Sequence, residues 1–105
     1  MSADGELLAM AAKAAGEPYT LANFAEPGEF EDGWGMVVDM ASFWNPLTNY
    51  GDTLRLAAKI GGQISIGRAY CRCRWISEPI RQGDVLGALC RAVVRSAAAT
   101  GRRLP

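Results

Sequence analysis

The stretch WNPLTNYGDTLRLAAKIGG, residues 44–62, predicts a turn that starts a helix, which then ends on paired glycines. Pro46 keeps the residue before it out of the helical conformation. Either Thr48 or Asn49 can accept hydrogen bonds from the first free backbone N–H groups. With Asn49 as the cap, Asp52 falls three residues later and places a carboxylate at the positive end of the helix. The pattern indicates a folded domain built around this helix, and it assigns the domain no task.

Helical spacing of apolar residues recurs near both ends of the chain. Residues 4–15 carry an apolar stripe that ends at Gly16. Residues 84–100 carry the clearest amphipathic pattern, with Asp84 as the cap and Gly101 as the end of the helix. The sequence therefore predicts three helices.

Strand-like alternation follows the central helix. Residues 63–66 and 69–76 alternate around a turn at Gly67-Arg68, which predicts an antiparallel hairpin over residues 63–76. Successive side chains of a strand point to opposite faces. The face that we expect to be buried carries Ala69, Cys71, Cys73 and Trp75. The opposite face carries Tyr70, Arg72, Arg74 and Ile76.

The remaining segments carry weaker signals. Residues 17–33 and 77–83 are rich in polar and turn residues, which predicts two loops. Residues 34–43 are compatible with a strand or a helix, since two adjacent valines favour a strand and the neighbouring methionines tolerate a helix. We expect a short third strand over residues 36–40.

These elements predict a single α+β domain over residues 1–105, with three helices and a short antiparallel sheet. Half of the residues are hydrophobic, which is enough for one modest core. The residues that we expect to form this core are Leu7, Leu8, Ala11, Trp44, Leu47, Leu54, Ala57, Ile64, Ile66, Cys71, Cys73, Trp75, Leu86, Leu89, Cys90, Val93 and Val94.

Charge is distributed unevenly along a chain whose formal net charge is zero. Residues 1–62 hold three basic and nine acidic residues, a net charge of −6. Residues 63–105 hold eight arginines and two acidic residues, a net charge of +6. Such asymmetry can mark an anionic partner. We favour the interpretation in which the two halves fold together and neutralise each other.

The sequence also bears on the location of the protein. No stretch approaches the length of a membrane span, and the acidic start of the chain is unlike a signal segment. Three cysteines, an odd number, do not indicate a disulfide framework. We therefore expect a soluble protein of the bacterial cytoplasm that makes no contact with a membrane.

The sequence offers little for catalysis or for a metal. It contains no histidine, so the commonest general base is missing, and it contains no nucleophile elbow. Cys71, Cys73 and Cys90 provide three thiols where a structural zinc ion needs four ligands, and we expect them to pack in the core. We therefore expect a non-enzymatic protein with no metal and no cofactor.

One basic surface can be predicted from the hairpin. Tyr70, Arg72 and Arg74 share a strand face, and Arg68 lies at the turn before them. Single-strand nucleic-acid binders use a basic sheet face with an aromatic residue to contact phosphates and stack on bases. The interpretation that we favour is an exposed edge strand whose charges prevent edge-to-edge pairing.

Three blocks of the sequence resemble a known family. They are ELLAMAAKAAG at residues 6–16, WNPL with GDTLRLA at residues 44–47 and 51–57, and RAVVRSAA at residues 91–98, which Gly101-Arg102 follow. Together they resemble the phage alpha-beta-alpha sandwich domain of phage and prophage proteins, and WNPL is the most specific part. The resemblance implies a sheet between helical layers, and it carries over no catalytic residue.

The resemblance also implies a small phage-encoded accessory protein without an established activity. Asn49 and Tyr50 stand where the family pattern implies two acidic residues, so a site for a hard cation is not expected. We expect the protein to act by binding a protein partner or a second copy of itself. Weak nucleic-acid binding through the arginine-rich strand at residues 68–74 is the alternative.

Overall fold

The computed structural model describes residues 3–39 and 42–105 of the chain. Its elements are, in chain order, α1 (Ala3–Ala15), the short 3-10 helix η1 (Leu21–Asn23), β1 (Phe24–Phe30), β2 (Gly33–Asp39), β3 (Ser42–Trp44), α2 (Tyr50–Ile60), β4 (Ile64–Ile66), β5 (Tyr70–Cys73), β6 (Ile76–Pro79) and α3 (Val85–Arg102). The α+β class, the three helices and the antiparallel hairpin after the central helix are confirmed. No helix of the described ranges is both long and apolar enough to cross a membrane.

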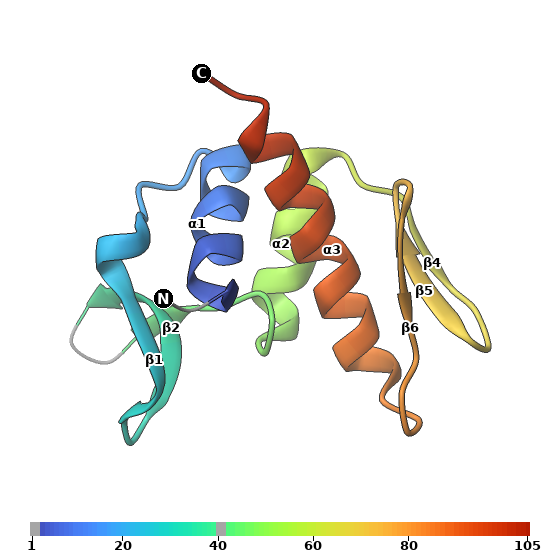
Figure 1. Cartoon of the computed structure of the whole chain (residues 1–105), viewed down its shortest axis with the longest axis horizontal. Helices are drawn as coiled ribbons and strands as arrows, with labels where there is room; N and C mark the ends of the chain where they lie inside the picture. The colour runs from blue at the N-terminus through green and yellow to red at the C-terminus, as the bar shows by residue number, and fades with distance from the viewer. Residues whose placement is uncertain (1–2, 40–41) are drawn as a thin grey trace.

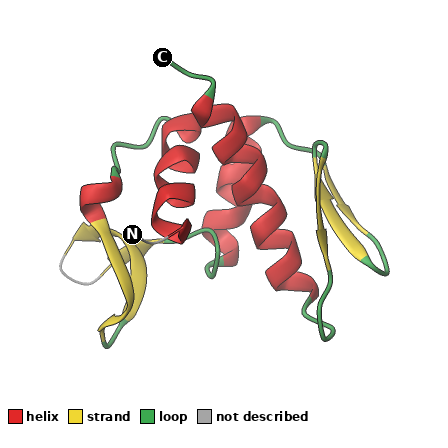
Figure 2. Ribbon diagram, in the orientation of Figure 1, coloured by secondary structure: helices red, strands yellow, loops and turns green. Residues whose placement is uncertain are grey.

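Helices form the middle of the molecule and strands form its two flanks (Figure 1). One antiparallel sheet has the order β1-β2-β3 and the other has the order β4-β5-β6. Figure 2 shows these sheets on opposite sides of the helices. The strands therefore form two sheets around a helical layer, where the resemblance implies one sheet between helical layers.

The first sheet contains a strand that was expected to be a loop. The prediction of a loop over residues 17–33 is wrong, because β1 pairs with β2 through the registers Phe24 to Met36 and Ala25 to Gly35. The pairing becomes irregular beyond Ala25, where the chain carries charged and turn residues. The strand expected over residues 36–40 is confirmed as the second half of β2, and its last residue lies outside the described residues.

The turn before α2 is held by Asn45, which is only 2 % exposed. Its backbone N–H donates to the Asp52 carboxylate over 3.0 Å. Its side-chain amide donates to the Trp34 carbonyl over 3.1 Å and accepts from the Leu47 N–H over 3.0 Å. These bonds join the turn to the start of α2 and to the strand β2.

The caps of α2 confirm the sequence prediction. The side chain of Asn49 accepts a hydrogen bond from the Asp52 N–H over 2.9 Å. Gly61 closes the helix in the left-handed conformation, with φ of 66°. Because Asp52 lies in the first turn, its carboxylate also complements the positive end of the helix.

The rotation of α2 differs from the prediction. The Thr53 hydroxyl is buried and donates to the Pro46 carbonyl over 2.6 Å, and it also lies 3.3 Å from the Cys90 sulfur on α3. This places Leu56 in the core and leaves Leu54 58 % exposed. The prediction of Leu54 as a core residue is therefore wrong, because the contacts of a polar residue set the buried face.

Helices α1 and α3 pack closely through small residues. Ala9, Ala11 and Ala12 of α1 are buried, and so are Ala97 and Gly101 of α3. A side chain at Gly101 would collide with the Met10 carbonyl. Gly101 therefore permits a close approach inside the helix and does not end it, and α3 continues to Arg102.

The core is otherwise largely as predicted. Leu8, Ala11, Ala57, Cys71, Cys73, Leu89, Cys90, Val93 and Val94 are buried. Leu7, Trp44, Leu47 and Ile64 are partly buried against the same cluster. Ile66, Trp75 and Leu86 are exposed and were wrongly predicted. Ile66 ends the edge strand β4, and Leu86 lies in the first turn of α3, so each is at the border of the packed region.

Candidate functional site

The outer side of the β4-β5-β6 sheet and the turn between β4 and β5 carry three of the four residues proposed for nucleic-acid binding. Cys71 and Cys73 are buried in the core cluster beside α3. Alternation along β5 then directs Tyr70 and Arg72 away from the helices. Arg68 is exposed in the turn between β4 and β5. We call Arg68, Tyr70 and Arg72 the basic face.

The basic face is open to solvent. Figure 1 shows that the described helices all lie on the other side of this sheet. Tyr70 is 58 % exposed, and Arg72 is also exposed. The Arg72 Nε donates to the Ser77 hydroxyl over 3.2 Å, across to the register partner on β6. This bond orients the guanidinium over the neighbouring strand and leaves its other donors available.

Arg74 leaves the basic face. Its backbone has a φ of 57°, so β5 ends at Cys73 and the chain turns into β6. Its guanidinium lies 3.4 Å from the Ile60 carbonyl at the end of α2 and 3.4 Å from the Thr100 hydroxyl. A cation at the carbonyl end of a helix is favourable. Arg74 therefore ties the second sheet to α2 and α3.

The same turn exposes Trp75, which was predicted to be in the core. This prediction is wrong, because the positive φ of Arg74 interrupts the alternation and leaves Trp75 64 % exposed. The Trp75 ring lies 4.7 Å from the Arg74 guanidinium and 6.0 Å from that of Arg103. The loop predicted over residues 77–83 is likewise shortened, since β6 continues to Pro79.

The opposite flank carries an acidic tip at the turn between β1 and β2. We define the acidic tip as Glu26, Glu29, Glu31 and Asp32, which are all exposed. The Glu29 carboxylate accepts from the Glu26 N–H over 2.9 Å, which holds this irregular part of the hairpin together. Phe30 is 51 % exposed in the same segment.

Ion pairs do little to neutralise the two halves of the chain. Within the described ranges, the pairs are Arg55 with Asp52, Lys59 with Glu17, Arg91 with Asp4, and Arg95 with Glu78. Of these pairs, Arg91 with Asp4 alone joins a residue before position 63 to one after it, and its atoms are 3.5 Å apart. The favoured interpretation of the charge asymmetry, mutual neutralisation, gains little support from these contacts.

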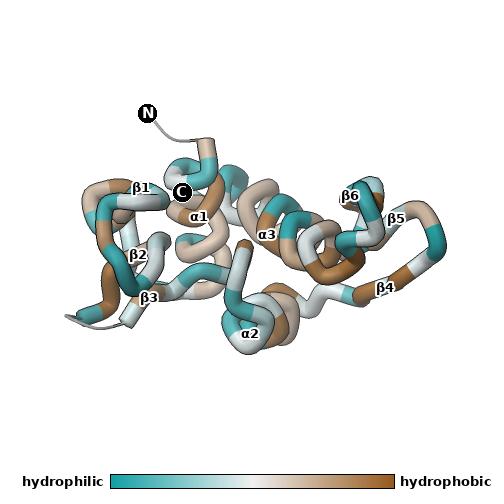
Figure 3. The backbone as a smooth tube through the Cα atoms, turned by 90° about the horizontal axis from the view of Figure 1, so that it is seen from below, coloured by the Kyte–Doolittle hydropathy of each residue, from teal (hydrophilic) through white to brown (hydrophobic). Residues whose placement is uncertain are grey.

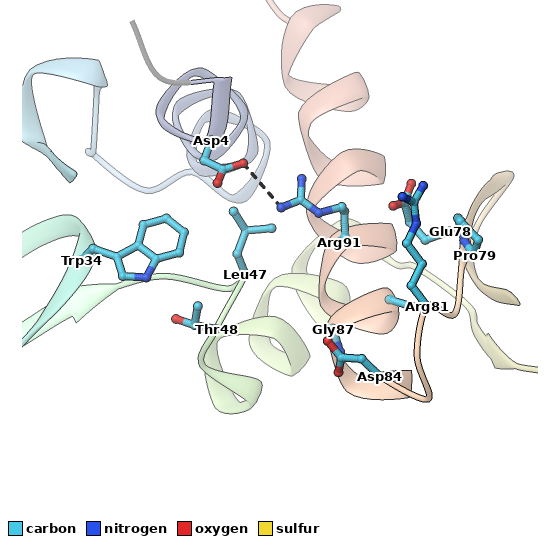
Figure 4. Close-up of a pocket in the computed structure, with 11 residues that line it drawn as sticks. Asp4, Trp34, Leu47, Thr48, Glu78, Pro79, Arg81, Asp84, Gly87 and Arg91 are labelled. Atoms are coloured by element: carbon cyan, nitrogen blue, oxygen red, sulfur yellow. Dashed lines mark hydrogen bonds and ion pairs between the residues drawn. The ribbon is translucent and has the colours of Figure 1, made fainter. Parts of the chain in front are cut away.

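A groove of about 520 Å³ lies where α1, β2, β6 and α3 meet (Figure 4). Gly87 and Arg91 of α3 line it, Trp34 and Leu47 line it from one side, and Glu78 lines it from β6. This groove could not be predicted from the sequence, because its residues come from distant segments that share no local motif. The groove carries acidic, basic and apolar side chains, so its chemistry selects no class of ligand.

The three cysteines are buried and free of disulfides. Burial raises the pKa of each thiol, so the nucleophilic thiolate is disfavoured at neutral pH. Cys90 also lies beside the Thr53 hydroxyl. Their packing in the core is as predicted. The residues that the structure describes contain no cluster of three His, Cys, Asp or Glu side chains placed to hold a metal ion.

The fold and the surfaces define a small α+β protein with one acidic and one basic flank. No family model, no curated protein and no solved structure matches the chain.

Proposed function

We propose that this chain is a non-enzymatic accessory protein of phage or prophage type, which acts in the cytoplasm of the bacterial host by binding a protein partner through its basic face. The observation that supports this proposal most is the exposure of Tyr70 and Arg72 on a sheet face that the described helices leave open, with Arg68 exposed in the adjoining turn. The phage origin and the cytoplasmic location rest on the sequence alone.

The residue types of the basic face are those that binding surfaces use. Tyrosine and arginine are enriched among the residues that contribute most to protein–protein affinity. Arg72 is already oriented by Ser77, so less side-chain freedom is lost when a carboxylate binds it. The arrangement favours an acidic segment of a protein, whose approach would be accelerated by the positive charge.

Nucleic-acid binding is the second candidate, and one observation favours it. Tyr70 and Arg72 share an open sheet face, and Trp75 is exposed beside two arginines in the turn that joins β5 to β6. Aromatic rings beside cations suit a single strand. Of the four residues proposed for this role, Arg74 is engaged with α2 and α3, which leaves Arg68, Tyr70 and Arg72.

Fluorescence anisotropy separates the two candidates. The probes are a fluorescein-labelled peptide of ten glutamates and a labelled deoxythymidine decamer, each titrated with the full chain at 0.05 M and 0.5 M salt. We expect the peptide to bind at low salt, and we expect Arg68→Gln/Arg72→Gln to weaken this binding by about tenfold or more. Tyr70→Ala tests the contribution of the aromatic ring.

The matched control is Arg81→Gln/Arg102→Gln, which removes the same charge from outside the basic face. An equal loss of peptide affinity in both double variants would mean that only the net charge matters, and the basic face would no longer be the proposed binding surface. Tighter binding of the oligonucleotide, lost in Arg68→Gln/Arg72→Gln or Tyr70→Ala, would replace the protein partner with nucleic acid. If neither probe binds at low salt, both candidates fail.

A further inference from the structure

The acidic tip and the basic face lie on opposite flanks of the molecule. Figure 3 shows the β1-β2-β3 and β4-β5-β6 sheets on opposite sides of the helices in a second view, turned by 90°. The longest dimension of the chain, along which the flanks are separated in Figure 1, is 38 Å. Exposed charges are largely screened beyond about 8 Å at physiological ionic strength. The two surfaces therefore cannot neutralise each other within one molecule.

The two surfaces match in more than the sign of their charge. The tip has carboxylates at both sequence neighbours of Phe30, whose ring is half-exposed and lies beside Phe43. The face has arginines two positions before and two positions after the half-exposed Tyr70. Carboxylates and guanidinium groups form paired, charge-assisted hydrogen bonds. Exposed aromatic rings add apolar contact area to such a surface. Each surface thus carries the groups that the other needs.

The two surfaces belong to different kinds of local structure. The tip is the end of a hairpin whose strand pairing is irregular between Ala25 and Phe30, so part of its backbone lies outside the regular ladder. The basic face combines two residues of the central strand β5 with one residue of the turn before it. In the described ranges, the four acidic residues of the tip take part in none of the ion pairs, and neither do Arg68 and Arg72.

We propose that the basic face binds a second copy of this chain, which presents its acidic tip. This inference rests on the proposed function and names the partner of the same face. The contact is heterologous, because the tip of one copy meets the face of the next. Each added copy leaves one free tip and one free face, so the assembly grows with concentration unless the rotation between copies closes it into a ring.

Electrostatic contacts of this kind depend strongly on salt. Complementary charges increase the rate of association and fix its register more than they increase affinity. We therefore expect self-association of the full chain at 0.05 M salt and an apparent affinity that is about tenfold or more lower at 0.5 M salt. Sedimentation velocity over a range of protein concentrations measures both quantities.

Two variants of the full chain test the direction of the contact. Glu29→Gln/Glu31→Gln weakens the tip and retains the face, whereas Arg68→Gln/Arg72→Gln weakens the face and retains the tip. Each variant alone should sediment as a monomer. An equimolar mixture should form a 1:1 dimer that does not grow further, because the dimer has no second intact pair of surfaces. Glu6→Gln/Arg102→Gln, which alters charges outside both surfaces, should associate like the parent.

Each other result would overturn the inference. The parent chain could remain monomeric at low salt, either double variant could associate like the parent, or the mixture could fail to form dimers. If association disappeared after nuclease treatment, nucleic acid would be the bridging partner. A decaglutamate peptide that still binds the parent, with no self-association, would leave the proposed function intact and remove only the second copy. If the parent chain neither associates with itself nor binds the decaglutamate peptide, both proposals fail.

Discussion

At the scale of single residues, Asn45 shows how one polar side chain can organise a turn. It bonds to β2, to its own turn and to the first turn of α2, and it is almost completely buried. Its side chain satisfies the Trp34 carbonyl and the Leu47 N–H, which are both in partly buried surroundings. The orientation of the turn therefore depends on an amide group at this position.

Asn45→Ala should lower the free energy of unfolding by about 2 kcal/mol, because it leaves these two backbone groups without partners. Urea denaturation followed by tryptophan fluorescence measures the change. Thr48→Ala is the matched control, since Thr48 is an exposed residue of the same turn. Its expected effect is within about 0.5 kcal/mol. Equal effects of the two substitutions would contradict the role assigned to Asn45.

Single residues also show which local features can be predicted from the sequence and which cannot. The sequence limited the cap of α2 to Thr48 or Asn49 and its end to the paired glycines, because each rests on local chemistry at a known spacing, and the structure uses Asn49 and Gly61. The left-handed backbone at Arg74 could not be predicted, because arginine has no preference for it. This backbone conformation occurs together with contacts of the Arg74 guanidinium to Ile60 and Thr100. These two residues are distant in the sequence and come near Arg74 only in the folded structure.

At the scale of elements, the contact of α1 with α3 depends on residues that have little or no side chain. Gly101 lies against the Met10 backbone, and alanines line much of the rest of the interface. Elsewhere in a helix interior, replacing a glycine with alanine stabilises a protein by about 1 kcal/mol. Because the backbones of α1 and α3 approach closely at Gly101, the same replacement should destabilise the protein at this position.

Gly101→Ala should lower the free energy of unfolding by about 1–3 kcal/mol, since the new methyl group forces the helices apart. Thermal and urea unfolding measure the change. Ala58→Gly, at an exposed position of α2, calibrates the cost of a glycine in a helix of this chain at about 1 kcal/mol. A stability gain in Gly101→Ala would show that the helices are not in such close contact.

The elements differ in how well the sequence predicts them. The three helices follow from their periodicity, and β5 follows from alternation. Strand β1 was missed because Pro27 and Gly28 are typical of turns, and its charged side chains give no alternating pattern. Its place in a sheet depends on pairing with β2, which is a tertiary contact.

At the scale of the whole molecule, the separation of the two charged flanks predicts that the acidic tip contributes little to the stability of the fold. Glu29→Gln/Glu31→Gln should change the free energy of unfolding by less than about 0.5 kcal/mol, because neither carboxylate pairs with a cation in the described part of the chain. Urea denaturation of dilute protein at low salt measures it. Glu78→Gln, which loses the pair with Arg95, should cost about 1 kcal/mol.

A loss above 1 kcal/mol in the first variant, on the scale of a charged hydrogen bond, would mean that the acidic flank stabilises the fold from within.

The basic face was only partly predictable from the sequence. Alternation correctly placed Tyr70 and Arg72 on one side of β5. The separation of the flanks and the groove where α1, β2, β6 and α3 meet could not be predicted, because they depend on how the elements are arranged in space.

The contact of α1 with α3 also determines when the fold can be completed during synthesis. Each sheet is made of strands that follow one another along the chain, so both can form from local pairing. The pair of Asp4 with Arg91 spans 87 positions. The alanine-lined side of α1 is therefore synthesised long before its partner helix, and it stays uncovered until α3 has left the ribosome and the two helices can pack.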